Sequence, residues 1–278
     1  MGKTTVFGAG FLGTRISNSL GYELVGKGTV DPTNLKDLSS FLDETKPSVV
    51  INAVGKTGKP NIDWCEKHQE ETLQSNVVAA INLSTECALR RIYFVHLSSG
   101  CMYQGDNGGK GFTEDDEPNF YGPQFYAKTK ILAERALKEL PGLILRLRMP
   151  IDDSPHERNL IDKLKKYPNL IDIPNSMTTV PHAIAVLKEM IDGRLQGVYN
   201  FVNPGKITAS EIMGMYQEIV DSSHSFGLLS LEGLNQITVA GRSNCYLNTD
   251  KLSSEGRILP SIHEAVKDCL IKYKENLK

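Results

Sequence analysis

A chain of 278 residues with a formal net charge of −2 can bury a sizeable core, and it offers no electrostatic reason to expect nucleic acid or an anionic membrane as a partner. Apolar residues make up 40% of the chain and charged residues 23%, as in an ordinary globular enzyme, and no apolar run approaches the roughly 20 residues that span a bilayer. The five cysteines are widely spaced and form no CxxC pair, so the sequence predicts neither a disulfide framework nor a metal site and favours a reducing, cytoplasmic location.

The first two thirds of the chain alternate short β-rich runs with helical patterns, as a parallel doubly wound sheet does. Strands are predicted at residues 4–8, 22–25, 48–53, 92–97 and 143–147. Helices are predicted at residues 11–20, 35–45, 70–89 and 124–140.

Beyond Met149, proline and loop residues become frequent, and short helices near 181–192, 210–220 and 262–273 alternate with brief strands. Thr208-Ala209-Ser210-Glu211 has the spacing of a capping box. We therefore predict an α/β fold, with a Rossmann doubly wound parallel sheet over residues 1–150 and a smaller C-terminal substrate lobe over 151–278. This prediction is compatible with a chain that crosses between the Rossmann domain and the substrate lobe.

A glycine-rich turn follows the first predicted strand. Gly8-Ala9-Gly10-Phe11-Leu12-Gly13 is a GxGxxG that opens the first predicted helix. The first glycine permits the tight turn, the second lets the backbone approach a pyrophosphate, and the third allows the helix to pack closely on the strand, while the helix N-terminus faces the phosphates. We predict a dinucleotide site that uses Gly8, Gly10, Phe11, Leu12 and Gly13; the alternative is a purely structural glycine turn.

The segment after the second strand bears on the choice of cofactor. An acid there would bind the ribose 2′-hydroxyl of NAD, but the chain reads Val25-Gly26-Lys27-Gly28, and Asp31 comes later, where it could reach the adenine. Lys27 suits a 2′-phosphate and so predicts NADP(H), unless it is a solvated loop lysine. Asn52, Ala53 and Val54, at the end of the third strand, are expected to contact the same cofactor.

A Tyr-x-x-x-Lys motif lies on the helix predicted at 124–140. The i, i+4 spacing places the phenol of Tyr126 and the ammonium of Lys130 on one face, where the positive charge favours phenolate and makes Tyr126 a usable proton donor or acceptor. Ser99 follows a predicted strand, at the sheet edge where cofactors bind, and could hydrogen-bond the same carbonyl. A short-chain dehydrogenase/reductase is indicated by the order of three features along the chain: the GxGxxG turn, the strand-end serine and the Tyr-x-x-x-Lys motif.

These residues are similar to the extended branch of that superfamily, the nucleotide-sugar enzymes. Residues 52–66, NAVGKTGKPNIDWCE, resemble the UDP-4-keto-6-deoxy-glucose 3,5-epimerase/4-reductases, which form the C-terminal domain of plant rhamnose synthases. Segments 125–130, 146–151, 173–178 and 241–244 match the same family.

The resemblance implies a role for several residues. The reductase triad falls on Ser99, Tyr126 and Lys130, the last two also contacting the cofactor, and the epimerase acid/base pair falls on Cys101 and Lys163. The implied activity is NADPH-dependent 3,5-epimerisation and 4-keto reduction of UDP-4-keto-6-deoxy-D-glucose to UDP-L-rhamnose. Candidates for substrate contacts are Lys59, Asn61, Trp64, Asn159, Asn175 and Arg242.

Two departures from the family pattern stand out. The family motif is usually GxxGxxG, and Phe7 occupies the place of its first glycine; residues 153–157, before Lys163, are diverged and one residue short. The alternatives are a reductase-only dTDP-4-dehydrorhamnose reductase, a GDP-fucose synthase-like enzyme, or a non-catalytic NADP-binding regulatory subunit. Cys101 is then a small strand-end residue and Lys163 a solvated helix lysine. Homodimers formed through the helices that correspond to 70–89 and 124–140 are common in the superfamily, so the resemblance implies a homodimer here.

Overall fold

The computed structural model describes residues 2–120, 122 and 124–277, which divide into two compact units. The first takes in Met1–Met102, Tyr121–Arg146 and Met190–Tyr199, and the second Tyr103–Phe120, Leu147–Glu189 and Asn200–Lys278. The chain crosses between the units several times, and the second is about as long as the first. The boundary expected at residues 150 and 151 stays a prediction.

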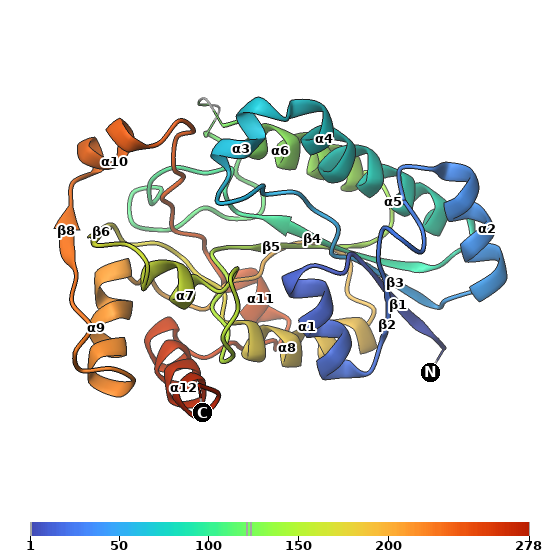
Figure 1. Ribbon diagram of the computed structural model, residues 1–278. Coiled ribbons are helices and arrows are strands. Elements are labelled where there is room, and N and C mark those ends of the chain that lie inside the picture. Colours follow the sequence, from blue (N-terminus) through green and yellow to red (C-terminus); the bar gives the residue numbers. More distant parts are fainter. Residues whose placement is uncertain (1, 121, 123, 278) are drawn as a thin grey trace. The chain divides into compact units, whose positions relative to one another are not determined.

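The first unit is built on a six-stranded sheet in the order β2-β1-β3-β4-β5-β7 (Figure 1). Its strands are β1 (Thr4–Phe7), β2 (Glu23–Val25), β3 (Val49–Asn52), β4 (Tyr93–Ser99), β5 (Leu143–Leu147) and β7 (Gly197–Asn200). β1 pairs in parallel with both β2 and β3, and β3 pairs in parallel with β4. The strand order therefore reverses between β1 and β3, and this is the switch point at which Rossmann folds bind their ligands.

Helices cover both faces of this sheet. They are α1 (Phe11–Leu20), α2 (Leu35–Thr45), α3 (Asp63–Lys67), α4 (Gln69–Leu73), the π-helical turn η1 (Gln74–Val78), α5 (Ala79–Leu89) and α6 (Phe125–Leu137). Figure 1 shows α4, α5 and α6 on one face and α1 on the other. Buried side chains of α2, α5 and α6 form one core with the strands, among them Leu38, Leu83, Leu137 and Phe94.

Most predicted elements of this unit are confirmed, and two differ. α2 and β5 have the predicted bounds, whereas the single helix expected at 70–89 consists of α4, η1 and α5. α3 was not predicted, because five residues are too few to show a helical period.

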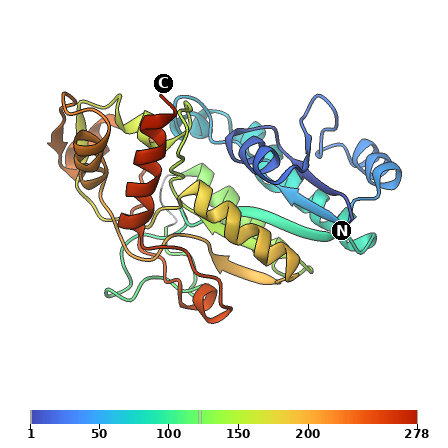
Figure 2. The ribbon, with the colours of Figure 1, turned by 90° about the horizontal axis from the view of Figure 1, so that it is seen from below.

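The second unit contains α7 (Leu160–Leu164), β6 (Asn169–Ile171), α9 (Ala209–Ile219), β8 (Gly227–Leu229), α10 (Leu231–Ile237), α11 (Asp250–Ser254) and α12 (Ile262–Glu275). α8 (Val180–Asp192) begins in this unit. α9 and α12 lie side by side in Figures 1 and 2, and their buried residues share one core with α7. The predicted capping box is present, because the Thr208 hydroxyl accepts the Glu211 amide and the Glu211 carboxylate accepts the Thr208 amide.

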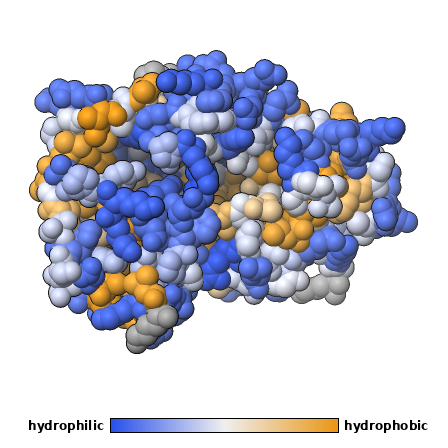
Figure 3. Space-filling model, viewed as in Figure 1, coloured by the Kyte–Doolittle hydropathy of each residue, from blue (hydrophilic) through white to orange (hydrophobic). Residues whose placement is uncertain are grey.

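The face drawn in Figure 3 is largely hydrophilic, with hydrophobic patches over the region of β8 and α10. Leu228 and Ile237, in these elements, are 64% and 73% exposed. Within the described part of the chain, none of the helices combines the length and the apolar character needed to traverse a bilayer.

Candidate active site

The glycine turn has the geometry that a dinucleotide needs. Gly8 has φ +107°, and a β-carbon on it would lie 2.7 Å from the backbone of Ala53 and Val54; on Gly13 it would lie 1.9 Å from the Gly8 carbonyl oxygen. A β-carbon on Gly10 would meet no described atom within 4 Å. Gly10 is also the N-cap of α1, so the open space lies at a helix N-terminus. Gly8 and Gly13 therefore shape the turn, whereas Gly10 leaves room for a phosphate.

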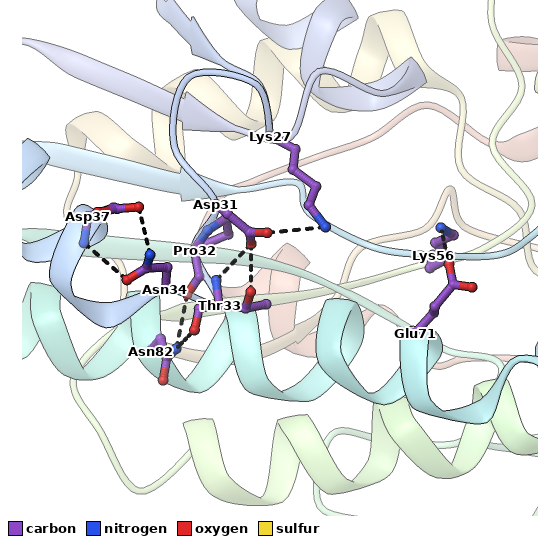
Figure 4. A network of polar contacts seen from close by, with 9 residues as sticks. All are labelled: Lys27, Asp31, Pro32, Thr33, Asn34, Asp37, Lys56, Glu71 and Asn82. Carbon is purple, nitrogen blue, oxygen red and sulfur yellow. Dashed lines mark hydrogen bonds and ion pairs between the residues drawn. The ribbon is translucent and has the colours of Figure 1, made fainter.

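Beyond β2 the chain carries an ion pair (Figure 4). Lys27 Nζ lies 3.1 Å from an Asp31 carboxylate oxygen, and the Lys27 side chain is 83% exposed. Thr33 donates to the same carboxylate from its amide (3.0 Å) and its hydroxyl (2.8 Å). Burial raises the pKa of Asp31, but the Thr33 hydrogen bonds and Lys27 outweigh burial and leave this pKa lowered. Lys27 therefore presents a solvent-facing cation at the expected place.

The end of β3 is held against the glycine turn. The Ala53 amide donates to the Phe7 carbonyl (2.8 Å), and the Val54 amide donates to the Asn52 side chain (2.9 Å). Asn52 Nδ2 in turn lies 3.0 Å from His96 Nδ1. Burial, with a smaller contribution from Lys130, holds the pKa of His96 well below its ordinary value. His96 is thus neutral at neutral pH and serves as a structural partner of Asn52.

Tyr126 and Lys130 lie one turn apart on α6, and both are buried. Lys130 Nζ donates to the Leu97 carbonyl on β4 (3.4 Å). Burial lowers the pKa of Lys130 to about 8, although electrostatic interactions with Cys101 and Glu134 oppose the shift. The helix therefore brings a buried ammonium to the end of β4, within electrostatic range of Cys101.

Ser99 is the last residue of β4, and Cys101 lies in the turn that follows the strand. The Cys101 amide donates to Ser99 Oγ (3.2 Å), which leaves the serine hydroxyl hydrogen available for another acceptor. Cys101 is a free, half-buried thiol. The first unit thus gathers Ser99, Cys101 and Lys130 around the end of one strand, with Tyr126 on the same helix as the lysine.

Asn76, in η1, braces this helix. Its buried amide donates to Thr129 Oγ1 on α6 (3.1 Å) and to the Lys56 carbonyl (3.2 Å), and it accepts the Lys56 amide (2.7 Å). Thr129 Oγ1 also donates to the Tyr126 carbonyl (2.7 Å). The loop after β3 and the turn that carries Tyr126 are therefore tied to one side chain.

A buried ion pair beneath the site was not predicted. Glu134 accepts two hydrogen bonds from Arg146 of β5 (2.9 and 2.6 Å) and one from the hydroxyl of Ser98 (2.8 Å), which directly precedes Ser99. Tyr126, Lys130 and Glu134 follow the i, i+4, i+8 spacing of one helix face. The available signal was an arginine inside the apolar strand LILRL, because a buried charge needs a partner.

The predicted substrate residues of the first unit lie in the loop after β3. Trp64 stacks on His68, with ring centroids 3.8 Å apart, and the Lys56 ammonium lies 4.9 Å from the Trp64 ring centroid. Asn61 accepts the Asp63 amide (2.8 Å) at the start of α3. Lys59 is exposed and precedes a cis proline. Their contacts with a substrate stay predictions.

Lys163 and Asn159 belong to the second unit. Lys163 is half-buried on α7, and burial together with Arg158 lowers its pKa, while Glu157 opposes the shift. Asn159 is the N-cap of α7, and its buried amide also contacts Asp152 and Ser154. Asn159 therefore holds the loop that leads to Lys163.

Asn175 and Arg242 lie near a fully buried arginine. Arg148 donates to Asn175 Oδ1 (2.7 Å), to the Ser243 hydroxyl (2.9 Å) and to the Ser243 carbonyl (3.0 Å). Asn175 also donates to Asn244 Oδ1 (2.9 Å). These contacts fix the segment that carries the half-buried Arg242. Substrate contacts of Asn175 and Arg242 stay predictions.

Among the residues that the structure describes, no cluster of His, Cys, Asp and Glu could hold a metal ion.

Residues 2–275 match the model of the RmlD substrate-binding domain family. The chain is 40% identical over 232 residues to a bifunctional dTDP-4-dehydrorhamnose 3,5-epimerase/dTDP-4-dehydrorhamnose reductase of Arabidopsis thaliana, a match that covers 81% of this chain and 77% of the plant protein. It is 38% identical over 284 residues to a trifunctional UDP-glucose 4,6-dehydratase/UDP-4-keto-6-deoxy-D-glucose 3,5-epimerase/UDP-4-keto-L-rhamnose-reductase of the same plant, covering 98% of this chain but only 40% of that longer protein.

Solved structures show the same fold. A UDP-rhamnose synthase from Acanthamoeba polyphaga mimivirus superposes with a TM-score of 0.92 at 30% identity, covering 98% of this chain and 99% of the viral one. A dTDP-4-dehydrorhamnose reductase from Bacillus anthracis, in complex with NADP, has a TM-score of 0.83 at 20% identity over 98% of this chain and 99% of its own.

Proposed function

Because the chain belongs to the RmlD substrate-binding domain family, we propose that it epimerises UDP-4-keto-6-deoxy-D-glucose at C3 and C5 and reduces its 4-keto group with NADPH, giving UDP-L-rhamnose. The predicted family, Rossmann fold and enzyme class are confirmed, since the relatives are nucleotide-sugar reductases and epimerases. Relatives that cover most of this chain's length support the reduction of a 4-keto sugar. We propose UDP as the nucleotide, NADPH as the cofactor, and the epimerisation as a second activity.

The residues of the first unit fit a dinucleotide. The space at Gly10 suits the close approach of a pyrophosphate, and the exposed Lys27 suits a 2′-phosphate. The NADP in the Bacillus anthracis structure supports the same choice. When bound, the cofactor supplies the hydride for C4.

The triad handles the proton of the reduction. The Tyr126 phenol protonates the C4 oxygen, and the Lys130 ammonium, one turn away, stabilises the phenolate that remains. The Ser99 hydroxyl, whose oxygen is held by the Cys101 amide, donates a hydrogen bond to the same oxygen. Since the pKa of Lys130 is about 8, the lysine is charged at neutral pH.

Epimerisation needs a base and an acid. The 4-keto group acidifies the protons at C3 and C5, and the Cys101 thiolate removes one as the negative charge passes to the C4 oxygen. Lys163, with its lowered pKa, returns a proton to the carbon. The observation that carries this proposal is the free thiol of Cys101, whose amide donates to Ser99 Oγ and which lies within electrostatic range of Lys130.

Two variants separate the half-reactions. We expect Cys101→Ala to stop consumption of the un-epimerised 4-keto sugar nucleotide while supplied epimerised substrate is still reduced. We expect Tyr126→Phe to do the reverse, losing NADPH oxidation while solvent deuterium still enters C3 and C5. If Cys101→Ala keeps full activity on the un-epimerised substrate, the proposed epimerase role of Cys101 is wrong and the reductase-only alternative is supported.

The non-catalytic alternative predicts no loss of NADPH absorbance with any 4-keto-6-deoxy sugar nucleotide and a partner protein that co-purifies. The four residues Ser99, Cys101, Tyr126 and Lys130 are all retained, which favours the enzyme. A homodimer and a cytoplasmic location stay predictions.

A further inference from the structure

The residue expected to meet the cofactor 2′-phosphate already has a partner, the carboxylate of Asp31 (Figure 4). We propose that Asp31 is a specificity-determining residue, which competes with the 2′-phosphate for Lys27 and so limits how strongly the enzyme prefers NADPH over NADH. This inference rests on the proposed function, which supplies the cofactor.

Lys27 stands next to the predicted phosphate site. The Gly8 amide donates to the Val25 carbonyl (2.9 Å), and a β-carbon on Gly26 would lie 3.3 Å from that of Ala9. Lys27 is therefore one residue from direct contact with the glycine turn. Its side chain is 83% exposed, so it can turn from one anion to another at little packing cost.

Asp31, by contrast, is fixed. Its carboxylate accepts both the amide and the hydroxyl of Thr33. The turn is anchored to α5, because Asn82 Nδ2 donates to the carbonyls of Pro32 (3.0 Å) and Thr33 (3.4 Å). The carboxylate therefore stays in place when Lys27 moves, and its charge continues to oppose a phosphate nearby.

A second carboxylate in Figure 4, that of Glu71, is already paired with a lysine. Glu71 lies 2.9 Å from Lys56, and its pKa is lowered chiefly by Lys56, with smaller contributions from His68 and Lys27. Asp31 is thus the direct competitor for Lys27. NADH carries a hydroxyl where NADPH carries the phosphate, so its binding leaves the Lys27–Asp31 pair intact.

Asp31→Asn tests the competition, because the amide oxygen can still accept both Thr33 hydrogen bonds. An exposed ion pair is worth little, so we expect NADPH to bind about two- to fivefold more tightly, with the NADH dissociation constant unchanged. Lys27→Gln should weaken NADPH binding by about tenfold, since it removes a charged contact. Dissociation constants for both cofactors are measured by titration of the purified protein, without substrate.

The matched control is Asp37→Asn, which removes the same charge from a carboxylate that hydrogen-bonds Asn34. It should leave both constants unchanged. In the Lys27→Gln background, Asp31→Asn should no longer tighten NADPH binding. An unchanged ratio of the two constants in Asp31→Asn, or equal tightening with and without Lys27, would overturn the inference while leaving the proposed function standing. If the wild-type protein binds neither cofactor, the proposed function fails, and this inference fails with it.

Discussion

Gly10 and Gly13 belong to one motif, yet the structure predicts opposite consequences for adding a methyl group to each. The backbone of Gly10 is extended (φ −92°, ψ −171°), so alanine fits there. Reduced freedom of the unfolded chain gains about 0.4–1 kcal/mol, and the poorer N-cap loses a similar amount, about 0.5–1 kcal/mol. We therefore expect Gly10→Ala to unfold within about 4 °C of the wild type.

Cofactor binding should respond differently. The β-carbon of Gly10→Ala fills the space proposed for the pyrophosphate, and fitting a methyl group into such a close contact costs about 1–3 kcal/mol. The cofactor dissociation constant should rise roughly 5- to 150-fold. Gly13→Ala places its β-carbon 1.9 Å from the Gly8 carbonyl oxygen, so the backbone must move, and the loss of stability should exceed about 3 kcal/mol.

Thermal unfolding of the cofactor-free protein and titration with NADPH distinguish the two effects. Gly10→Ala should unfold near the wild-type temperature and bind NADPH more weakly. Gly13→Ala should unfold at a clearly lower temperature. Wild-type affinity in a folded Gly10→Ala variant would refute the assignment of this turn to a pyrophosphate.

Three further predictions concern the residues around Lys130. Glu134→Ala removes the carboxylate partner of buried Arg146 and should cost about 3–5 kcal/mol in urea unfolding, whereas replacing both residues by Leu and Met should cost far less; equal losses would contradict this. Lys130→Met should be more stable than the wild type at pH 7, because the folded-state pKa of Lys130 (about 8) lies below its ordinary value of 10.5. Between about pH 8 and pH 10.5 the unfolded wild-type chain binds more protons than the folded one, so the free energy of unfolding of the wild type rises with pH. The stability difference between Lys130→Met and the wild type should therefore be smaller at pH 10 than at pH 7, as measured by urea unfolding at both values. Asn76→Ala leaves the Lys56 amide without its side-chain acceptor and should cost about 1–3 kcal/mol, with a lower kcat than Asn76→Asp if the bracing of α6 matters.

The local parts of the fold could be predicted from the sequence, and the long-range parts could not. The helix at Leu35–Thr45 has a clear apolar face and an asparagine N-cap, and its bounds were predicted to the residue. The glycine turn and the Tyr126–Lys130 spacing follow from fixed local geometry. The ion pair Glu134–Arg146 joins a helix to a strand, and no local sequence pattern predicts which buried carboxylate pairs with which buried arginine.

The candidate site shows the same division. Ser99 and Cys101 were placed correctly at the end of a strand, since strand ends follow from the apolar run. The π turn that carries Asn76 was not predicted, because a single widened turn hardly disturbs the helical period of 70–89. The pairing of Lys27 with Asp31 was not predicted either, because two residues spaced i, i+4 in a loop do not share a helical face that would indicate the contact.

The π-helical turn Gln74–Val78 limits how this stretch of chain can vary in length. A π turn closes one residue later than an α turn, so removing one residue would restore a regular helix. Each residue of an α-helix advances the side chains by about 100°, and the Asn76 amide would then face away from both Lys56 and Thr129. Homologous chains that keep this asparagine should therefore align across 69–89 without a gap.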